Sequence, residues 1–150
     1  VPAGPEAAIV HGDYRLDNAL VGPGDEIVAV LDWEMATLGD PLADLGVMLV
    51  YWDWQAAMPA SGVSDAIRPE AGFPTGEQMC RRYASRRGVD LHELPWYHAF
   101  GCFKVAVILE GIHYRHAAGQ TLGPGFERIG DHVAPLVDLG HRALERTTAR

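Results

Sequence analysis

Short apolar runs and turn residues alternate over the first 32 positions of the chain. Residues 8–10 and 18–21 are each long enough for a brief strand. Residues 27–31 form a nearly continuous apolar run that is rich in β-branched residues. Between the last two runs stands Gly22-Pro23-Gly24-Asp25, a dense turn signal. The pattern predicts three short strands, with a tight turn between the second and the third.

Helical spacing begins after residue 40. Asp40 is a favoured N-cap residue, Pro41 suits the first helical position, and apolar residues then recur at 42, 45, 49 and 52. A helix is therefore expected to start at this pair. Residues 55–73 contain prolines and glycines without periodicity, and they predict an irregular connection.

The second half of the chain predicts three further helices. Residues 75–78 (TGEQ) match a capping box, and Gly88 suits the position just past a helix end, so a helix is expected over 76–87. Residues 95–117 are apolar on more than one face, which is typical of a buried helix. A last helix is expected over about 126–147, with a kink near Pro135.

The element order predicts an α+β fold that is mostly helical, because a few short strands must pack on helices to be stable. The 150 residues are 48% hydrophobic and 21% charged, as in a globular domain with one core. With 12 Lys and Arg against 20 Asp and Glu, the net charge of −8 argues against a nucleic-acid partner.

Several locations and site types are disfavoured by what the chain does not contain. No apolar stretch reaches the length of about 18 residues that a transmembrane helix needs, so no membrane partner is expected. No signal peptide is visible at Val1. The two cysteines, Cys80 and Cys102, form no disulfide framework, so we expect core thiols and a cytoplasmic protein.

Polar chemistry gathers in the loop over residues 11–18 (HGDYRLDN) and at Asp32, which ends a predicted strand. Phosphoryl transfer needs oxygen ligands for Mg²⁺, a carboxylate that accepts the proton of the attacking hydroxyl, and a cation near the transferred group. Asp13 can be that base, and Asn18 and Asp32 can share the metal ion. Arg15, on the same loop, can reach the transferred phosphoryl group.

Three motifs in this order resemble a known family. The five-residue spacing from Asp13 to Asn18 is that of the kinase catalytic loop, which a second aspartate follows. Together with residues 31–34 (LDWE) and 39–45 (GDPLADL), the loop resembles the aminoglycoside phosphotransferase and choline kinase-like family, which shares the protein-kinase fold. The residues of the first two motifs are similar to those of a subgroup that includes kinase domains fused to acyl-CoA dehydrogenases. The strong match covers residues 8–50.

The resemblance implies an ATP- and Mg²⁺-dependent kinase that phosphorylates a small-molecule hydroxyl. It implies that Asp13 is the catalytic base and that Asn18 and Asp32 bind magnesium. It also implies three structural supports, namely a packed histidine, a helix cap and a buried carboxylate that braces the loop: His11, Asp40 and Asp44. Glu34 stands where many relatives have glycine, which leaves open whether a third carboxylate faces the metal.

A kinase of this fold also needs a strand lysine on the phosphates, a glutamate that pairs with it, and a loop over the phosphates. Only ten residues precede His11, and the only lysine, Lys104, falls far downstream in a predicted buried helix. We therefore expect residues 1–150 to be a C-terminal catalytic and substrate-binding lobe without its nucleotide-clamping lobe, inactive by itself. Such a lobe should expose apolar surface and self-associate, or bind a partner there.

A polar stripe interrupts the predicted buried helix at Glu110, His113 and Tyr114. A di-metal bundle needs the Glu-x-x-His element twice, and here it occurs once, so a metal site is disfavoured. In a kinase the stripe could line the acceptor pocket. The nearby acidic residues are too scattered to favour an aminoglycoside, and a hydroxylated acyl or other small metabolite is the working hypothesis.

Two other functions stay open. The first is a non-catalytic, kinase-like interaction module, although a decayed site usually loses one member of the set Asp13, Asn18 and Asp32. The second is a metal-dependent phosphoester hydrolase with His11 and Asp13 as ligands, although the further His and Asp clusters of a two-metal site are absent from the sequence.

Overall fold

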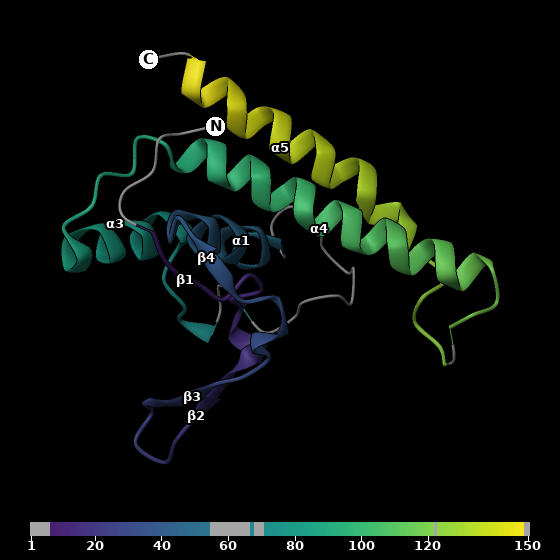
Figure 1. The fold of residues 1–150 in the computed structure, drawn as a ribbon, viewed down its shortest axis with the longest axis horizontal. Helices are drawn as coiled ribbons and strands as arrows, with labels where there is room; N and C mark the ends of the chain where they lie inside the picture. Colours follow the sequence, from purple (N-terminus) through teal and green to yellow (C-terminus); the bar gives the residue numbers. More distant parts are fainter. Residues whose placement is uncertain (1–6, 55–66, 68–70, 122, 149–150) are drawn as a thin grey trace.

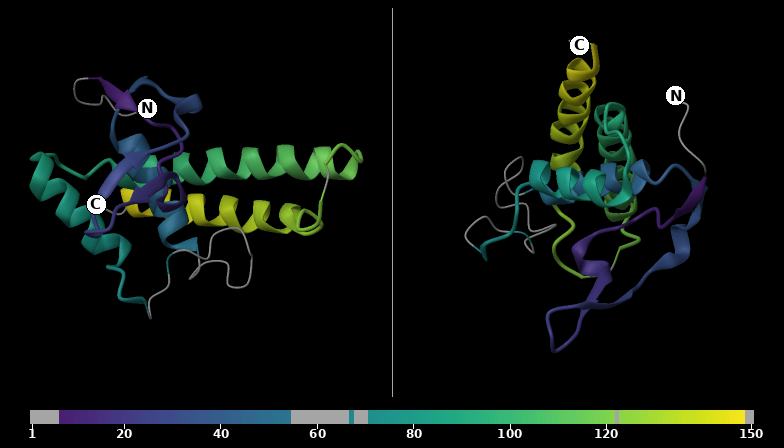
Figure 2. Two further views of the ribbon diagram at one scale, coloured as in Figure 1. Left: turned by 90° about the horizontal axis from the view of Figure 1, so that it is seen from below. Right: turned by 90° about the vertical axis from the view of Figure 1, so that its left-hand side faces the viewer.

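Two long antiparallel helices set the longest dimension of the molecule (Figure 1). The computed structural model describes residues 7–54, 67, 71–121 and 123–148. The helices α4 (Leu94–Ala117) and α5 (Val133–Thr148) lie side by side, and they remain so in both views of Figure 2. Helix α1 (Leu42–Trp52) packs against α4, and α3 (Gly76–Arg87) lies beyond α1. The described residues also include short turns of 3₁₀ helix, among them η1 (Leu16–Asn18), η2 (Trp33–Met35) and η4 (Ile129–His132).

The strands form two separate antiparallel pairs. β2 (Ala19–Val21) pairs with β3 (Ile27–Val30), and this hairpin projects from the helices at the bottom of Figure 1. β1 (Ala8–Val10) pairs with β4 (Thr37–Gly39), which the sequence did not predict. A three-residue strand is too short to show an alternating pattern, so only its pairing with β1 identifies it. The mostly helical α+β class is confirmed.

Local capping signals predicted the helix starts well. In α3 the Gln78 amide donates to Thr75 Oγ1 (3.2 Å) while Thr75 N donates to Gln78 Oε1 (2.8 Å), which is the reciprocal capping box. Gly88 ends this helix with a φ of 66°. At the start of α1, Leu42 N donates to Asp40 Oδ1 (2.8 Å), so Asp40 caps the helix.

Glycines let α1 and α4 approach closely at their crossing. A Cβ atom on Gly46 would lie 2.3 Å from the carbonyl oxygen of Tyr97, and one on Gly101 would lie 2.8 Å from the carbonyl oxygen of Gly46. The core forms around this contact and the neighbouring face of α5. Its most deeply buried large side chains come from the three helices and the residues after α1: Trp54, Leu136, Val50, Val105 and Cys102.

The structure corrects two helix predictions. Helix α4 is not buried all round, because α1 and α5 cover only part of it and leave Phe103 64% and Val107 55% exposed. The last helix begins at Val133 rather than near 126, after the η4 turn. Pro135 then falls in the first turn, where no amide hydrogen bond is lost, so it gives no reason for a kink.

Most of the irregular connection predicted over residues 55–73 lies outside the described residues. In the part of the chain that is described, no helix is both long and apolar enough to cross a membrane. Both cysteines are free and buried, as predicted.

Candidate active site

The loop after β1 is held by a carboxylate from the first turn of α1. Asp44 accepts hydrogen bonds from His11 N (2.7 Å, at Oδ2) and from Gly12 N (2.8 Å, at Oδ1). Gly12 has a φ of 86°, and a Cβ atom there would lie 2.5 Å from the carbonyl oxygen of Met35, so only glycine fits. A helix 33 residues downstream in the sequence thereby fixes the backbone path just before Asp13.

The His11 ring packs beneath the loop and bonds only to backbone atoms. It is 2% exposed, its Nε2 lies 2.7 Å from the carbonyl oxygen of Leu31, and its Nδ1 accepts from Asp13 N (3.2 Å). Its ring centroid is 4.6 Å from that of Trp33. Because both ring nitrogens are engaged, Nε2 carries the proton and neither nitrogen is free to bind a metal.

Asp13 and Asn18 meet across the loop. Asn18 Nδ2 donates to the carbonyl oxygen of Asp13 (2.9 Å) and contacts Asp13 Oδ2 at 3.4 Å. With its amide nitrogen turned to Asp13, Asn18 keeps Oδ1 as the atom that a cation would contact. Leu31 N donates to the carbonyl oxygen of Asn18 (2.8 Å), which ties the end of the loop to the residue before Asp32.

Asp32 sits at a left-handed backbone position with φ 64° and ψ 54°, which aspartate tolerates better than most residues. The side chain is exposed, and among the described residues it has no hydrogen-bond or ion-pair partner. The pairing of Ala19 with Val30 brings this strand end next to Asn18.

The oxygens of Asn18 and Asp32 suit Mg²⁺, which usually takes only one or two protein carboxylates and completes its shell with water and phosphate oxygens. Over the described residues, no group of three or more His, Cys, Asp or Glu side chains gathers as a metal site. An amide oxygen and one exposed carboxylate therefore fit a cation that the substrate helps to hold, rather than a fully protein-bound one.

Arg15 and Tyr51 form a polar network beside Asp13. Arg15 Nη2 pairs with Asp17 Oδ2 (2.9 Å), and its guanidinium carbon lies 4.7 Å from the ring centroid of Tyr51. Tyr51 is buried, and its hydroxyl lies close enough to Arg15 and Asp13 for both to affect its pKa. Burial and the Asp13 charge raise the pKa of Tyr51 against the opposing effect of Arg15, so the phenol stays neutral.

Burial lowers the pKa of Arg15, but the Tyr51 hydroxyl and the charges of Asp17 and Asp13 more than offset this, and the net change is upward. Arg15 therefore remains a cation next to Asp13. The sequence analysis missed Tyr51, although it lies seven residues after Asp44 and thus on the same face of α1.

Lys104 lies in the expected helix, but its contact with the loop was not predicted. Its ammonium group donates to the carbonyl oxygen of Gly12, 92 residues away in sequence, so the lysine of α4 touches the loop. A single lysine in the otherwise apolar stretch over residues 99–109 was the available signal.

The predicted acceptor stripe lies along one side of α4, because helix positions three and four apart are neighbours. Glu110 and Tyr114 are exposed there. His113 is half-buried and lies against the η4 turn, where a Cβ atom on Gly130 would be 2.8 Å from its ring. The use of this stripe as an acceptor pocket stays a prediction.

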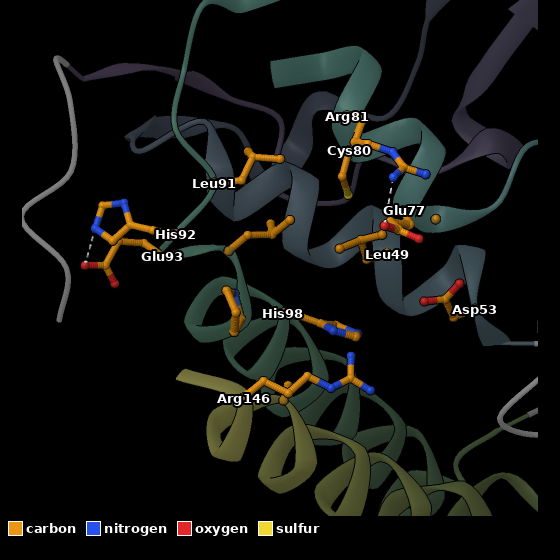
Figure 3. Close-up of a pocket in the computed structure, with 14 residues that line it drawn as sticks. Leu49, Asp53, Glu77, Cys80, Arg81, Leu91, His92, Glu93, His98 and Arg146 are labelled. Atoms are coloured by element: carbon orange, nitrogen blue, oxygen red, sulfur yellow. Dashed lines mark ion pairs between the residues drawn. The ribbon is translucent and has the colours of Figure 1, made fainter. Parts of the chain in front are cut away.

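A cavity of about 820 Å³ lies away from the loop, between α1, α3, α4 and α5 (Figure 3). His98 and Arg146 extend into it opposite Asp53. Burial, with the nearby charge of Arg146, lowers the pKa of His98 to about 4. No residue of the loop over 11–18 lines this cavity.

Comparison with known proteins places these features in a family. Residues 1–79 match the family model described as the phosphotransferase enzyme family. The chain is 32% identical over 145 residues to acyl-CoA dehydrogenase family member 11 of Rattus norvegicus, covering 95% of this chain and 19% of that protein. For family member 10 of Mus musculus the identity is 34% over 142 residues, covering 93% and 13%.

A solved structure extends the likeness to the fold. It is a Ralstonia eutropha protein with a provisional assignment as an aminoglycoside phosphotransferase, 31% identical to this chain, with a TM-score of 0.76. The likeness covers 93% of this chain and 43% of that one. The chain thus spans about a fifth or less of these curated relatives. Since the family match covers more than half of the chain, including the loop that Asp44 holds, this protein belongs to the phosphotransferase enzyme family.

Proposed function

We propose that the protein takes part in transfer of the ATP γ-phosphoryl group to the hydroxyl of a small molecule, with Asp13 as the base. The observation that carries this is the contact between Asp13 and Asn18, on a loop that Asp44 holds and next to the unpaired carboxylate of Asp32. Family membership supports phosphotransferase chemistry in general. ATP, magnesium, the acceptor class and each residue's role belong to the proposal.

The roles follow from where each side chain lies. Asp13 accepts the proton of the attacking hydroxyl, and its hydrogen bond from Asn18 orients the carboxylate. Asn18 and Asp32 would hold Mg²⁺, which neutralises charge on the phosphates when bound. Arg15 supplies a further positive charge beside Asp13.

The acceptor and the location are proposed on weaker grounds. Likeness to acyl-CoA dehydrogenase family members supports a hydroxylated acyl compound or another small metabolite as the acceptor. Two buried free thiols, Cys80 and Cys102, agree with a reducing cytoplasm. The hydrolase alternative loses support, because both nitrogens of its proposed ligand His11 already bond to the backbone.

The metal-binding part can be tested on the chain itself. Mn²⁺ added to ¹⁵N-labelled protein should broaden the amide signals around residues 18 and 32 before all others. Asp32→Asn should weaken this broadening about tenfold or more, because Asp32 carries the only full negative charge of the two proposed ligands, Asn18 and Asp32. Glu26→Gln, an exposed carboxylate at the turn of the same hairpin, is the matched control. Equal broadening in the wild type and Asp32→Asn would contradict the metal assignment.

The catalytic part needs the full-length protein that carries these residues. With Mg·ATP and candidate hydroxyl compounds, Asp13→Ala should lower turnover by about 10²–10⁴-fold, the usual contribution of a positioned base. Asp17→Ala, which removes a carboxylate of the same loop that pairs with Arg15, should cost far less. Turnover that persists near the wild-type rate in Asp13→Ala would exclude Asp13 as the base.

A further inference from the structure

We propose that Lys104 is a positioning residue that fixes the peptide between Gly12 and Asp13. The inference rests on the proposed function, in which Asp13 is the base. The lysine ammonium group donates to the carbonyl oxygen of Gly12. That carbonyl belongs to the peptide group that leads into Asp13, so its orientation sets the direction in which the Asp13 side chain leaves the backbone.

Both polar atoms of this peptide are then held by side chains. Lys104 holds its carbonyl oxygen from α4, and His11 Nδ1 accepts from its amide nitrogen at 3.2 Å. The preceding peptide is held by Asp44 from α1, through Gly12 N at 2.8 Å. Gly12 cannot resist rotation by itself, since a positive φ is open to glycine without steric cost. The loop is therefore rigid because two helices bond to it.

The charges around Lys104 favour this contact. A small cavity of about 240 Å³ lies under the loop, and Lys104 is the only cation among the residues that line it. Two carboxylates line it as well. Asp40 accepts from Leu42 N and the Tyr97 hydroxyl, and Asp44 accepts from backbone amides. Among the described residues neither aspartate forms an ion pair, and Lys104 brings a positive charge to the cavity that both of them line.

The position of Lys104 on α4 requires a long cationic side chain. Its neighbours one turn away on the same face are Phe100 and Ile108, so the helix is otherwise apolar there. The four-carbon stem passes along apolar surface and delivers the ammonium group to the carbonyl. A hydrogen bond from a charged donor is also stronger than one between neutral groups.

The test uses the ¹⁵N-labelled chain. Lys104→Met keeps the length of the stem and removes the donor. We expect a changed ¹⁵N shift at Asp13, because its amide nitrogen shares the peptide whose carbonyl loses a hydrogen bond. We also expect its amide hydrogen exchange to accelerate about tenfold, the factor for one net hydrogen bond. Lys104→Arg keeps a cation, so the ¹⁵N shift and the amide exchange rate of Asp13 should both stay close to the wild-type values.

Arg115→Met removes a cation from an exposed position of the same helix and should leave Asp13 unchanged. Unchanged exchange at Cys102, in the core, shows that each variant is folded. An Asp13 amide that is unaffected in folded Lys104→Met would overturn the proposal. If Lys104→Met fails to fold, Lys104→Leu, which also has no donor, gives the same comparison.

Enzyme kinetics separate this inference from the function on which it rests. In the full-length protein, Lys104→Met should lower kcat with little change in the KM for ATP, since Lys104 acts through Asp13. If the Asp13 amide signals change as expected while kcat stays at the wild-type value, Lys104 still positions the loop, and the assignment of Asp13 as the base is wrong.

Discussion

Single side chains that bond to the backbone define the shape of the candidate site. Asp44 holds two successive amides of the loop, and His11 joins the loop to the end of β3. Such bonds remove the freedom of a glycine-containing loop without covering Asp13. His98 differs from these residues, because its Nε2 is buried without a hydrogen-bond partner among the described residues.

His98 should make stability depend on pH. Its pKa is about 4 in the folded protein, against about 6.5 when unfolded. The unfolded chain therefore binds the proton first, so the free energy of unfolding is highest above pH 6.5 and falls as the pH drops toward 4. This one group can account for up to about 3 kcal/mol. His98→Gln should flatten the decline, as measured by urea unfolding at each pH.

The exposed His141 provides the control for this experiment. His141→Gln changes a histidine of α5 whose side chain is exposed. Its pH profile should follow that of the wild type. Identical profiles for the wild type and His98→Gln would show that His98 does not carry the effect.

At the scale of elements, the site depends on how α1 and α4 cross. Asp44 and Tyr51 approach the loop from α1, and Lys104 approaches it from α4. The two helices keep these groups in reach because Gly46 and Gly101 bring their backbones together. The strand pairs of three and four residues are too short to hold the loop by themselves.

Two glycines of α4 should respond to alanine with opposite signs. In Gly101→Ala the new Cβ atom would lie 2.8 Å from a backbone oxygen of α1, so the helices must separate, at a cost of roughly 1–3 kcal/mol. In Gly111→Ala the atom nearest to the new Cβ is Arg115 Nη1 at 3.6 Å, so nothing has to move. The higher helix propensity of alanine should then stabilise the protein by about 0.5–1 kcal/mol. Denaturant unfolding measures both. Equal effects would contradict the close crossing.

At the scale of the whole molecule, one side of α4 is left uncovered. Phe103, Val107 and Tyr114 are 64%, 55% and 71% exposed there. Monomeric proteins seldom expose contiguous apolar surface without a role for it. The chain spans 43% of its solved relative. Self-association through the uncovered face stays a prediction that can be measured.

Self-association of the chain through this face should appear in sedimentation velocity as an average mass that rises with concentration. Phe103→Glu should shift the rise to higher concentration, because it places a charge in the apolar surface. Leu144→Glu is the control, since Leu144 is an exposed apolar residue of α5. A mass that stays monomeric at all concentrations, or an equal effect of both variants, would contradict this use of the α4 face.

Short-range signals explain what could be predicted in advance. The capping box fixed α3 at Gly76–Arg87, and the turn at residues 22–25 fixed the β2–β3 hairpin. The five-residue spacing brought Asn18 to Asp13. Each of these signals acts between residues only a few positions apart, where the backbone itself determines the geometry. The motif loop and its expected chemistry could therefore be recognised from the sequence.

Only the tertiary structure decided which distant residues meet the loop. Lys104 reaches Gly12 across 92 positions, and the pairing of β4 with β1 appears only in the fold. Neither follows from a local pattern, because each contact joins residues that are distant in the sequence. The sequence by itself determined the family motif, and helix packing decided what holds that motif in place.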